Sequence, residues 1–574
     1  MKKLLVILLV AFANFSFGKT EINVADYGVK GDGSDSTAAV QKVLAAAKSA
    51  GGDVVIKFPK GRYDFAPNYA PEEYLFISNN DEGLKRIVFN LNGYENITID
   101  GQGSDFIFHG FVNPFSVKNS KNINFKNFSV DVFRPFHNEG IVLESSPGSI
   151  VVEIPEEYPF EVQEGILKFI GKPDPLLWDD PKKVDIPYRS LLEFDTKRRE
   201  TAYLARDYWL NKGCPAEKLD GRKVRIRHSL AKFTPGNTVV FQYQYRNHPT
   251  FAVSKSENVN FDNVTIYGAG GMGILGQNSR DIRVRNCKVT PSGNRMISCT
   301  ADATHFVNCE GEIVLDSNLF ENQMDDATNI HGIYEQIVSI DGDTAVTRLV
   351  HPQQHGFETF EAGQKVEFVG GRSMKTLAEG KITSVERINN ELKRLKFAEP
   401  VSDSVKPNDA IAVIRDYPEI KITNNTIRRN RARGMLLNCR GKTLVENNLF
   451  QAPGAALLFE GDSCYWFEQG GVRDCTIRGN TFDNCRFGVW GKAIIDVAAG
   501  IKEDFETSRY NRNILIENNT FNVFDDTPLL NIYCVDGLVW RNNKVNKTSE
   551  YPARDIKKPE PFIIKHSDNI KIDN

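Results

Sequence analysis

Short stretches of alternating apolar and polar residues recur along most of the chain, and each ends in a polar, usually asparagine-bearing turn. Glu95-Asn-Ile-Thr-Ile-Asp100 is typical, because its two isoleucines fall on one face and its polar side chains on the other. Further examples are 121–127, 258–264, 281–286, 312–318, 419–425, 442–448, 474–480, 513–519 and 537–543. Each stretch is therefore predicted to be a short β-strand with one buried face.

The spacing of these strands predicts a solenoid. Equivalent positions lie 26 residues apart from Ile97 to Ile123, 23 from Val259 to Ile282, and 33 from Leu444 to Ile477. One coil of a parallel β-helix contains two or three short strands and their turns, which takes about this many residues. Asparagine tolerates left-handed backbone conformations, so it suits the corners, and stacked asparagines are expected to form hydrogen-bonded ladders.

The N-terminal part predicts a helix that covers one end of this solenoid. Ser34 to Ala50 reads as amphipathic, with Val40, Val43 and Leu44 on one face, a serine or aspartate at its start and Gly51-Gly52 after it. The stretch from Asp26 to Tyr63 resembles the entry segment of the pectate-lyase-like β-helix superfamily. The expected fold is all-β, a right-handed parallel β-helix with an N-terminal capping helix.

Two stretches, 131–250 and 335–415, contain strand patterns without the asparagine signature. Both are predicted to be small, β-barrel-like insertions that either wall a substrate groove or make a subunit contact, such as that of a homodimer. The predicted division is a signal peptide at 1–18, β-helix at 19–130, an insertion at 131–250, β-helix with candidate catalytic aspartates at 251–334, an insertion at 335–415, and β-helix at 416–574.

The first 18 residues have the composition of a signal peptide. Lys2 and Lys3 precede the apolar run Leu4–Phe12, and small or polar residues follow up to Gly18. The run is too short to span a bilayer comfortably, and no other stretch is apolar enough to do so. Export to the periplasm or the medium is therefore expected, with no membrane span.

Composition narrows the class of partner. Apolar residues make up 41% of the chain and charged residues 25%, with a formal net charge of −3. No basic stretch suits nucleic acid, and a neutral polymer or oligosaccharide would suit this surface better than a polyanion. The nine cysteines lack the density and CxxC pairing of a zinc or disulfide scaffold, and neither a metal nor a cofactor is expected.

The candidate chemistry lies in aspartates that are one coil apart. Asp325 and Asp326 are adjacent, and Asp302 precedes Asp325 by 23 residues. Residues one coil apart stack at about 4.8 Å, so the three carboxyl groups are expected to meet. Mutual repulsion would raise the pKa of at least one, leaving one carboxyl to donate a proton while another stays ionised, as glycoside hydrolysis requires. The pair Asp525-Asp526 has no aspartate one coil earlier and ranks lower.

Asp302 together with Gln323-Met-Asp-Asp-Ala-Thr-Asn-Ile-His-Gly332 resembles glycoside hydrolase family 110. The resemblance implies an inverting exo-α-1,3-galactosidase, a group that includes enzymes removing the terminal galactose of blood group B antigens. It also implies an oligosaccharide or glycoconjugate substrate. Polygalacturonases also place an aspartate about one coil before an Asp-Asp pair. Their following Gly-His-Gly and Arg-x-Lys segments are not found here in the expected order, which argues against a polyuronide substrate.

The similarity to polygalacturonases implies roles for the three aspartates. Asp325 would protonate the leaving oxygen, while Asp302 and Asp326 would hold and deprotonate the attacking water, although acid and base could be exchanged. An inverting enzyme separates its acid and base by roughly 6.5–9.5 Å. The candidate substrate-binding residues, with a tryptophan to stack on galactose, are His305, Asn329, His331, Arg433, Glu460 and Trp490.

Three other interpretations remain open from sequence. One is a polygalacturonase-like hydrolase, disfavoured by the missing basic segment. Another is a polysaccharide lyase, in which Asp302, Asp325 and Asp326 would bind calcium. The third is a carbohydrate-binding or adhesive β-helix without turnover.

Overall fold

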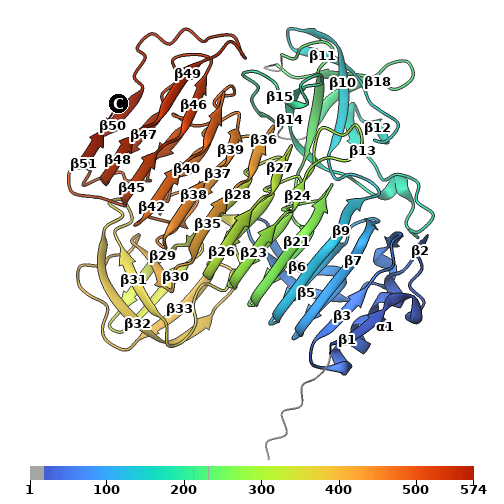
Figure 1. The fold of residues 1–574 in the computed structure, drawn as a ribbon, viewed down its shortest axis with the longest axis horizontal. Helices are drawn as coiled ribbons and strands as arrows, with labels where there is room; N and C mark the ends of the chain where they lie inside the picture. Colours follow the sequence, from blue (N-terminus) through green and yellow to red (C-terminus); the bar gives the residue numbers. More distant parts are fainter. Residues whose placement is uncertain (1–18, 211–212, 230–231, 574) are drawn as a thin grey trace, which may run out of the picture.

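The computed structural model describes residues 19–210, 213–229 and 232–573, which form a right-handed parallel β-helix with two β-rich insertions (Figure 1). Parallel strands stack side by side along the molecule. The stack begins at the blue N-terminal end, where α1 (Thr37–Ala50) lies, and ends at the red C-terminal strands β50 (Phe562–Lys565) and β51 (Asp568–Ile572). The predicted signal peptide, 1–18, lies outside the described residues. The fold class expected from the repeats is confirmed.

Each coil contributes short strands that pair in register with those of the next coil. In one central coil these are β25 (Thr304–Val307), β26 (Glu310–Asp316) and β27 (Leu319–Glu321). β25 pairs in parallel with β28 (Thr328–Ile333), and Thr304 lies opposite Thr328. A residue that precedes one strand by a given number of positions therefore lies about 4.8 Å from the residue that precedes the paired strand of the next coil by the same number.

One sheet carries the candidate site on its outer face. Its parallel strands are β6 (Asp81–Asn92), β8 (Asn113–Lys118), β20 (Phe251–Ser254), β22 (Ile274–Gln277), β25, β28, β37 (Met435–Leu437), β40 (Leu457–Phe459), β44 (Ile495–Val497), β47 (Leu530–Tyr533) and β50. β5 (Glu72–Ile77) pairs antiparallel with β6, and β41 (Glu468–Gln469) with β28.

The remaining solenoid strands form the other faces. They are β1 (Thr20–Asn23), β2 (Asp32–Asp35), β3 (Val54–Lys57), β4 (Arg62–Phe65), β7 (Glu95–Phe108), β9 (Lys121–Val132), β21 (Glu257–Ile266), β23 (Arg280–Arg285), β24 (Lys288–Val289), β26, β27, β35 (Glu419–Thr423), β36 (Thr426–Arg428), β38 (Thr443–Glu446), β39 (Leu449–Gln451), β42 (Cys475–Arg478), β43 (Thr481–Asp483), β45 (Asn511–Glu517), β46 (Thr520–Val523), β48 (Val535–Arg541), β49 (Lys544–Lys547) and β51.

The interior is apolar and ordered in columns. Phe450 and Phe482 stack with ring centroids 5.3 Å apart, and Phe482 and Phe521 with centroids 4.7 Å apart. All three side chains are fully buried. Stacking identical residues from coil to coil fills the narrow interior and adds aromatic contact energy to the area buried.

A buried asparagine ladder runs through one corner of the solenoid. The side-chain amide of Asn425 donates to Asn448 Oδ1 at 2.9 Å, and that of Asn448 donates to Asn480 Oδ1 at 2.9 Å. Each of these asparagines also donates its backbone N–H to the same acceptor oxygen. The ladder continues from Asn318 at one end to Asn543 at the other. The asparagine signature of the repeat is thus a structural requirement of the corner.

The capping helix begins three residues later than the pattern indicated. Residues Asp32–Asp35 form β2, which pairs with β4, and α1 starts at Thr37. Asp35 Oδ1 accepts the backbone N–H groups of Thr37, at 2.9 Å, and of Ala66, at 3.1 Å, so it ties the start of the helix to the first coil. The helix packs its apolar face onto the end of the core.

The first insertion is an antiparallel sheet that joins the solenoid beside β9. Its strands are β10 (Asn138–Ser146), β11 (Ser149–Glu153), β12 (Phe160–Gln163), β13 (Ile166–Phe169), β14 (Tyr188–Asp195), β15 (Glu200–Thr201), β16 (Tyr208–Trp209), β17 (Cys214–Lys218), β18 (Lys223–Arg227) and β19 (Thr238–Tyr243). It lies at the upper right in Figure 1.

The second insertion is a closed barrel at the lower left in Figure 1. Its strands are β29 (Glu335–Asp341), β30 (Thr344–Arg348), β31 (Lys365–Val369), β32 (Thr376–Arg387), β33 (Leu392–Phe397) and β34 (Ala410–Ile414). The barrel has its own apolar core, which includes Val366, Leu395 and Ile411.

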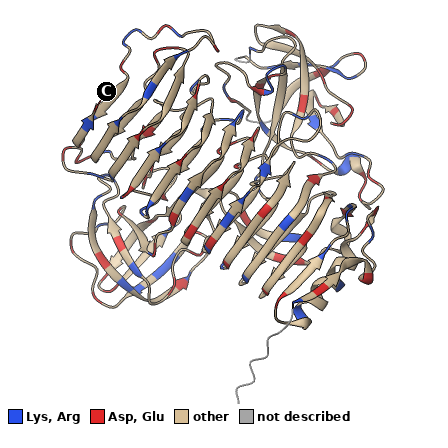
Figure 2. Cartoon of the chain, in the orientation of Figure 1, with Lys and Arg blue, Asp and Glu red and all other residues tan. Residues whose placement is uncertain are grey.

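In Figure 2 the positions of acidic residues (red) and basic residues (blue) are interspersed along the ribbon. Among the described residues, no helix has the length and apolarity needed to cross a membrane.

We expect Asn448→Ala to destabilise the protein strongly. The substitution leaves the backbone and side-chain donors of Asn425 without their acceptor inside the solenoid, at a cost of about 2–4 kcal/mol. Thermal unfolding should show a clear fall in Tm. The control is Asn546→Ala, whose half-buried side chain makes one ladder bond to Asn522; an equal loss in both variants would contradict a special role for the buried ladder.

Candidate active site

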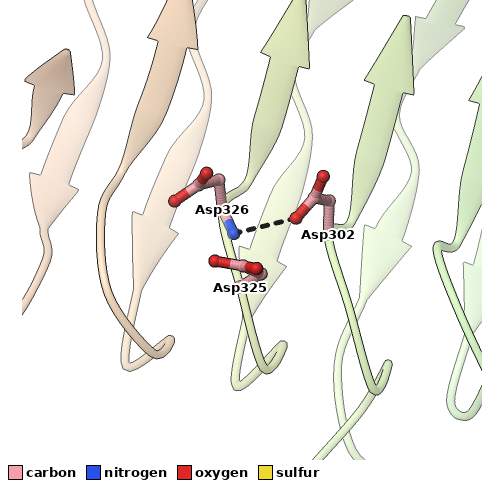
Figure 3. A group of neighbouring side chains, drawn as sticks. All are labelled: Asp302, Asp325 and Asp326. Carbon is pink, nitrogen blue, oxygen red and sulfur yellow. Dashed lines mark hydrogen bonds between the residues drawn. The ribbon is translucent and has the colours of Figure 1, made fainter. Parts of the chain in front are cut away.

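The structure brings the three predicted aspartates together. Asp302 lies two residues before β25 and Asp326 two residues before β28, so the register of these strands stacks one on the other. The backbone N–H of Asp326 donates to Asp302 Oδ1 at 3.3 Å (Figure 3). One oxygen from each of Asp302, Asp325 and Asp326 lies within 4.8 Å of the other two, and all three residues are buried.

Arginines surround these carboxylates. Asp325 accepts hydrogen bonds from Arg246 Nη2 at 2.6 Å and from Arg431 Nη1 at 3.1 Å. Arg433 binds Asp326 at two points, Nε to Oδ1 at 3.0 Å and Nη2 to Oδ2 at 2.9 Å. Such two-point pairing is among the stronger charged hydrogen-bond arrangements in proteins.

The register explains the position of Arg433. β28 pairs with β37, and Thr328 lies opposite Met435. Arg433 therefore occupies, in the next coil, the place that Asp326 and Asp302 occupy in theirs. A column of two carboxyl groups and a guanidinium follows directly from the offset of two residues before each strand.

The first insertion completes the charged cluster. Arg246 follows its last strand, and Asp207 accepts two hydrogen bonds from Arg431, at 2.8 and 2.7 Å. Arg431 is thus held between Asp207 and Asp325. Sequence reasoning missed Arg246, Asp207 and Arg431, because no repeat pattern relates the insertion to the coil that it contacts. Only the Arg431-Ala-Arg433 segment, just before a strand, offered a signal.

The three carboxyl groups differ in their electrostatic environment. Burial, reinforced by neighbouring Asp325, raises the pKa of Asp302 to about 7. Burial also acts to raise the pKa of Asp325, but the surrounding arginines, Arg246 foremost, hold it well below its usual range. For Asp326, burial and the neighbouring carboxyls raise the pKa, while the two-point pairing with Arg433 favours the ionised form. One site therefore holds carboxyls of opposite proton affinity.

The two predicted histidines lie behind Asp302. His305 Nδ1 is 2.6 Å from Asp302 Oδ2, and His305 Nε2 is 3.1 Å from His331 Nε2. Both side chains are fully buried. Burial lowers the pKa of His305 to about 4 and also lowers that of His331. Neither histidine is among the residues that line the pocket in front of the aspartates, so neither lies where a bound sugar would contact it.

A pocket opens in front of the aspartates. Its volume is about 500 Å³, including the space at its open mouth. Its lining includes the predicted residues Asn329, Arg433 and Glu460. The full set is Asn79, Arg246, Asp302, Asp325, Asp326, Asn329, Arg433, Leu436, Glu460, Gly461, Asp462, Trp466 and Glu468. A larger groove, about 1080 Å³ on the same measure, lies elsewhere and has none of the three aspartates in its lining.

Trp466, and not Trp490, is the tryptophan of this lining. Trp490 packs under Arg431, whose guanidinium lies 5.6 Å from the ring centroid, so it supports an arginine of the cluster. Trp466 is 39% exposed and lines the pocket. His351 of the second insertion lies against it, with centroids 4.5 Å apart. The sequence pattern favoured Trp490 because it follows a repeat strand, whereas Trp466 lies in a loop.

The donor set does not fit a calcium ion, as the lyase interpretation would require. Calcium takes about six to eight oxygen ligands. Both oxygens of Asp325 and both of Asp326 are bound by arginine, and one oxygen of Asp302 by His305. The positive charge that a cation would bring is already supplied by guanidinium groups.

Three protein-family models match the chain. "GLAA-B beta-barrel domain I" matches residues 138–239, "GLAA-B beta-barrel domain II" matches 344–411, and "Right handed beta helix region" matches 409–555. The first two ranges fall in the two insertions, and the third covers the C-terminal coils.

Full-length relatives are also found. Alpha-1,3-galactosidase A of Shewanella woodyi is 35% identical over 542 residues, 93% of this chain and 87% of that protein. Alpha-1,3-galactosidase B of Phocaeicola vulgatus is 32% identical over 589 residues, 97% and 94% of the two chains. Among solved structures, the mannuronan C-5 epimerase AlgE6 A-module of Azotobacter vinelandii matches with a TM-score of 0.41 and 11% identity, covering 95% of this chain and 98% of that one, which is too distant to bear on function.

We expect the stability of the Asp302→Asn variant, relative to the wild type at the same pH, to increase as the pH rises. Folded Asp302 keeps its proton up to about pH 7, whereas the unfolded residue releases it near its ordinary pKa of about 4. The folded state therefore loses stability between these values, and an uncharged amide avoids that loss. The gain in Tm over the wild type should grow by on the order of 2 °C from acid to mildly alkaline pH. A gain that is independent of pH would contradict the raised pKa.

Proposed function

This chain belongs to glycoside hydrolase family 110, the α-1,3-galactosidases, and on that premise we propose that it releases terminal α-1,3-linked galactose from glycans of the blood group B type or the linear Galα1-3Gal type. The observation that carries the proposal is the set of three buried carboxyl groups within 4.8 Å of one another, with pKa values shifted in opposite directions. Such a pair of environments separates an acid from an ionised partner in glycosidases.

The size and lining of the pocket support exo action. Its lining combines solenoid residues with Asn79, with Arg246 and with the loop that carries Glu460 and Trp466, around about 500 Å³. A pocket of this size suits a terminal sugar better than the middle of a polymer. Trp466 offers an aromatic face to the apolar side of galactose, and the polar groups around it can bind the hydroxyls.

Two assignments of acid and base are open to test. Similarity to polygalacturonases makes Asp325 the acid. The charge distribution of this structure favours the exchange, because the arginines keep Asp325 ionised while Asp302 carries a proton near neutral pH. A general acid must hold its proton before the glycosidic bond breaks.

Inversion is proposed from the family relationship. The closest oxygens of the three carboxyls are nearer than the roughly 6.5–9.5 Å that separates acid and base in most inverting enzymes. Retention, however, needs a nucleophilic carboxylate, and the arginines around Asp325 lower its pKa and with it the basicity of its oxygens. Guanidinium groups also bind both oxygens of Asp325 and both oxygens of Asp326, which leaves neither carboxyl free to attack.

Export and assembly are further proposals. The signal-peptide pattern of 1–18 supports export to the periplasm or the medium, and cell fractionation with N-terminal sequencing of the mature protein tests it. A homodimer formed through an insertion stays a prediction, which light scattering of the purified protein would test.

We expect Asp302→Asn, Asp325→Asn and Asp326→Asn each to lower kcat by about 10²–10⁴-fold on Galα1-3Gal, because each loses a carboxyl that transfers or positions a proton. The matched control is Asp526→Asn, the exposed member of the other acidic pair, whose carboxylate binds Lys547. It should keep near-normal kcat. Full activity of the Asp325 variant would contradict the site.

The same variants separate the two role assignments. Loss of the general acid is tolerated when the leaving group needs no proton, so the acid variant should retain far more activity on 4-nitrophenyl α-galactoside than on the disaccharide. Loss of the base lowers both rates together.

A proton NMR time course with Galα1-3Gal tests inversion, since β-galactose should appear first, and early α-galactose would establish retention.

We expect Trp466→Ala to raise KM about tenfold with a smaller change in kcat, because the loss of a stacking face removes on the order of 1.4 kcal/mol of sugar binding. Trp178→Ala removes another highly exposed tryptophan, which packs on Tyr69 and does not line the pocket. Steady-state kinetics of the two variants should differ. Equal KM values would show that Trp466 does not contact the substrate.

A further inference from the structure

A chain of hydrogen bonds runs from Asp302 into the protein on the side away from the pocket. Asp302 Oδ2, His305 Nδ1, His305 Nε2 and His331 Nε2 follow one another at 2.6 and 3.1 Å. His331 Nδ1 ends the chain at 2.7 Å from the carbonyl oxygen of Gly332. Every hydrogen bond needs one donor and one acceptor, so the far end of this chain constrains the near end.

The far end has only one solution. A carbonyl oxygen only accepts, so the hydrogen between His331 and Gly332 belongs to His331 Nδ1. If the ring is neutral, its Nε2 then carries a lone pair. His305 must therefore donate from Nε2, which leaves His305 Nδ1 as the acceptor. The 2.6 Å contact with Asp302 Oδ2 then requires a hydrogen on the carboxyl group.

The surroundings favour two neutral rings. Both side chains are fully buried, and burial lowers the pKa of each imidazole, that of His305 to about 4. Around His305, Glu468 and Asp325 favour protonation and Arg246 opposes it. Around His331, Glu468 and Asp302 favour protonation and His305 opposes it. His331 Nε2 lies 3.6 Å from Glu468 Oε1, beyond a direct hydrogen bond.

We propose that His305 and His331 are positioning residues that fix a proton on Asp302 Oδ2, and so decide which of the three aspartates is the neutral one. The proposal rests on the proposed function, in that Asp302 belongs to the catalytic group. It deepens that function by assigning the proton that the carboxyl cluster shares. Asp325 is then the ionised member, which agrees with its two arginine partners.

The same chain allows Asp302 to ionise without exchanging a proton with solvent. The Oδ2 proton passes to His305 Nδ1 while the hydrogen on His305 Nε2 passes to His331 Nε2. Asp302 becomes a carboxylate and His331 an imidazolium, with the Glu468 carboxyl group 3.6 Å from the new charge. No proton enters or leaves, so total charge is conserved. Asp302 has two states that differ only in where two hydrogens lie.

Nitrogen NMR of the whole protein, selectively labelled with ¹⁵N at its nine histidines, tests the assignment directly. Spectra at about pH 5.5, below the raised pKa of Asp302 and above that of His305, distinguish the two neutral tautomers. His305→Gln and His331→Gln assign the signals. We expect His331 to carry its hydrogen on Nδ1 and His305 on Nε2. A hydrogen on His305 Nδ1 would mean that Asp302 is ionised and would overturn the proposal.

The pH profile of kcat/KM gives a second test. His305→Phe removes the acceptor that favours protonated Asp302. The limb of the profile that reports the ionisation of Asp302, near pH 7, should therefore shift to lower pH by about one unit, a tenfold change in the proton affinity of this carboxyl. The control is His109→Gln, because His109 is also a buried histidine bound to carboxyl groups, Asp64 at 2.9 Å and Asp174 at 2.6 Å, but lies outside the site. Its limb should not move.

The two tests separate the possible failures. A limb that stays in place in His305→Phe overturns the role of the histidines even if kcat falls, since lost packing alone does not shift it. If His305→Phe does not fold, the wild-type NMR result still decides. An inactive wild type with the expected tautomers would overturn the proposed function and leave the proton assignment standing.

Discussion

The in-register stacking of coils is the constraint on which the rest of this structure depends. Successive coils lie about 4.8 Å apart, so whatever residue a coil places at a corner faces its equivalent in the next coil. Phenylalanines and asparagines gain from this arrangement, through ring stacking in the interior and amide ladders at the corner. Aspartates do not, because like charges repel at that distance and burial penalises each of them. The column of Asp302 and Asp326 is therefore a local violation of the rule that stabilises the solenoid, which is characteristic of functional sites.

The protein offsets this repulsion with groups drawn from several parts of the chain. Arg433 follows in the same column, Arg431 belongs to the same loop, and Arg246 comes from the end of the first insertion. His305 supplies an acceptor on the protein side. Since each carboxyl has a different set of partners, their proton affinities separate. The interactions that offset the repulsion thus also give Asp302 a raised pKa and Asp325 a lowered one.

The insertions act on the site from two directions. The first provides Arg246 and Asp207, which fix Asp325 and Arg431. The second supports the loop that carries Trp466, through His351 and a hydrogen bond from Gln354 to the Trp466 carbonyl oxygen at 2.9 Å. The first insertion therefore contributes a residue of the pocket lining, Arg246, and the second supports another, Trp466.

The sequence by itself determined the repeated elements and the proximity of the aspartates, because both follow from local alternation and from a spacing of about one coil. Strand Ile-x-Ile patterns, corner asparagines and the 23 residues from Asp302 to Asp325 are all properties of adjacent coils. Only the tertiary structure decided the partners of Asp325, the burial of His305 and His331 behind Asp302, and the choice of Trp466 over Trp490. The partners of Asp325 and the choice of tryptophan depend on how loops and insertions far apart in the chain fold back over one outer face. No periodic signal records such contacts, since each is made once and by side chains whose neighbours in sequence carry no repeat.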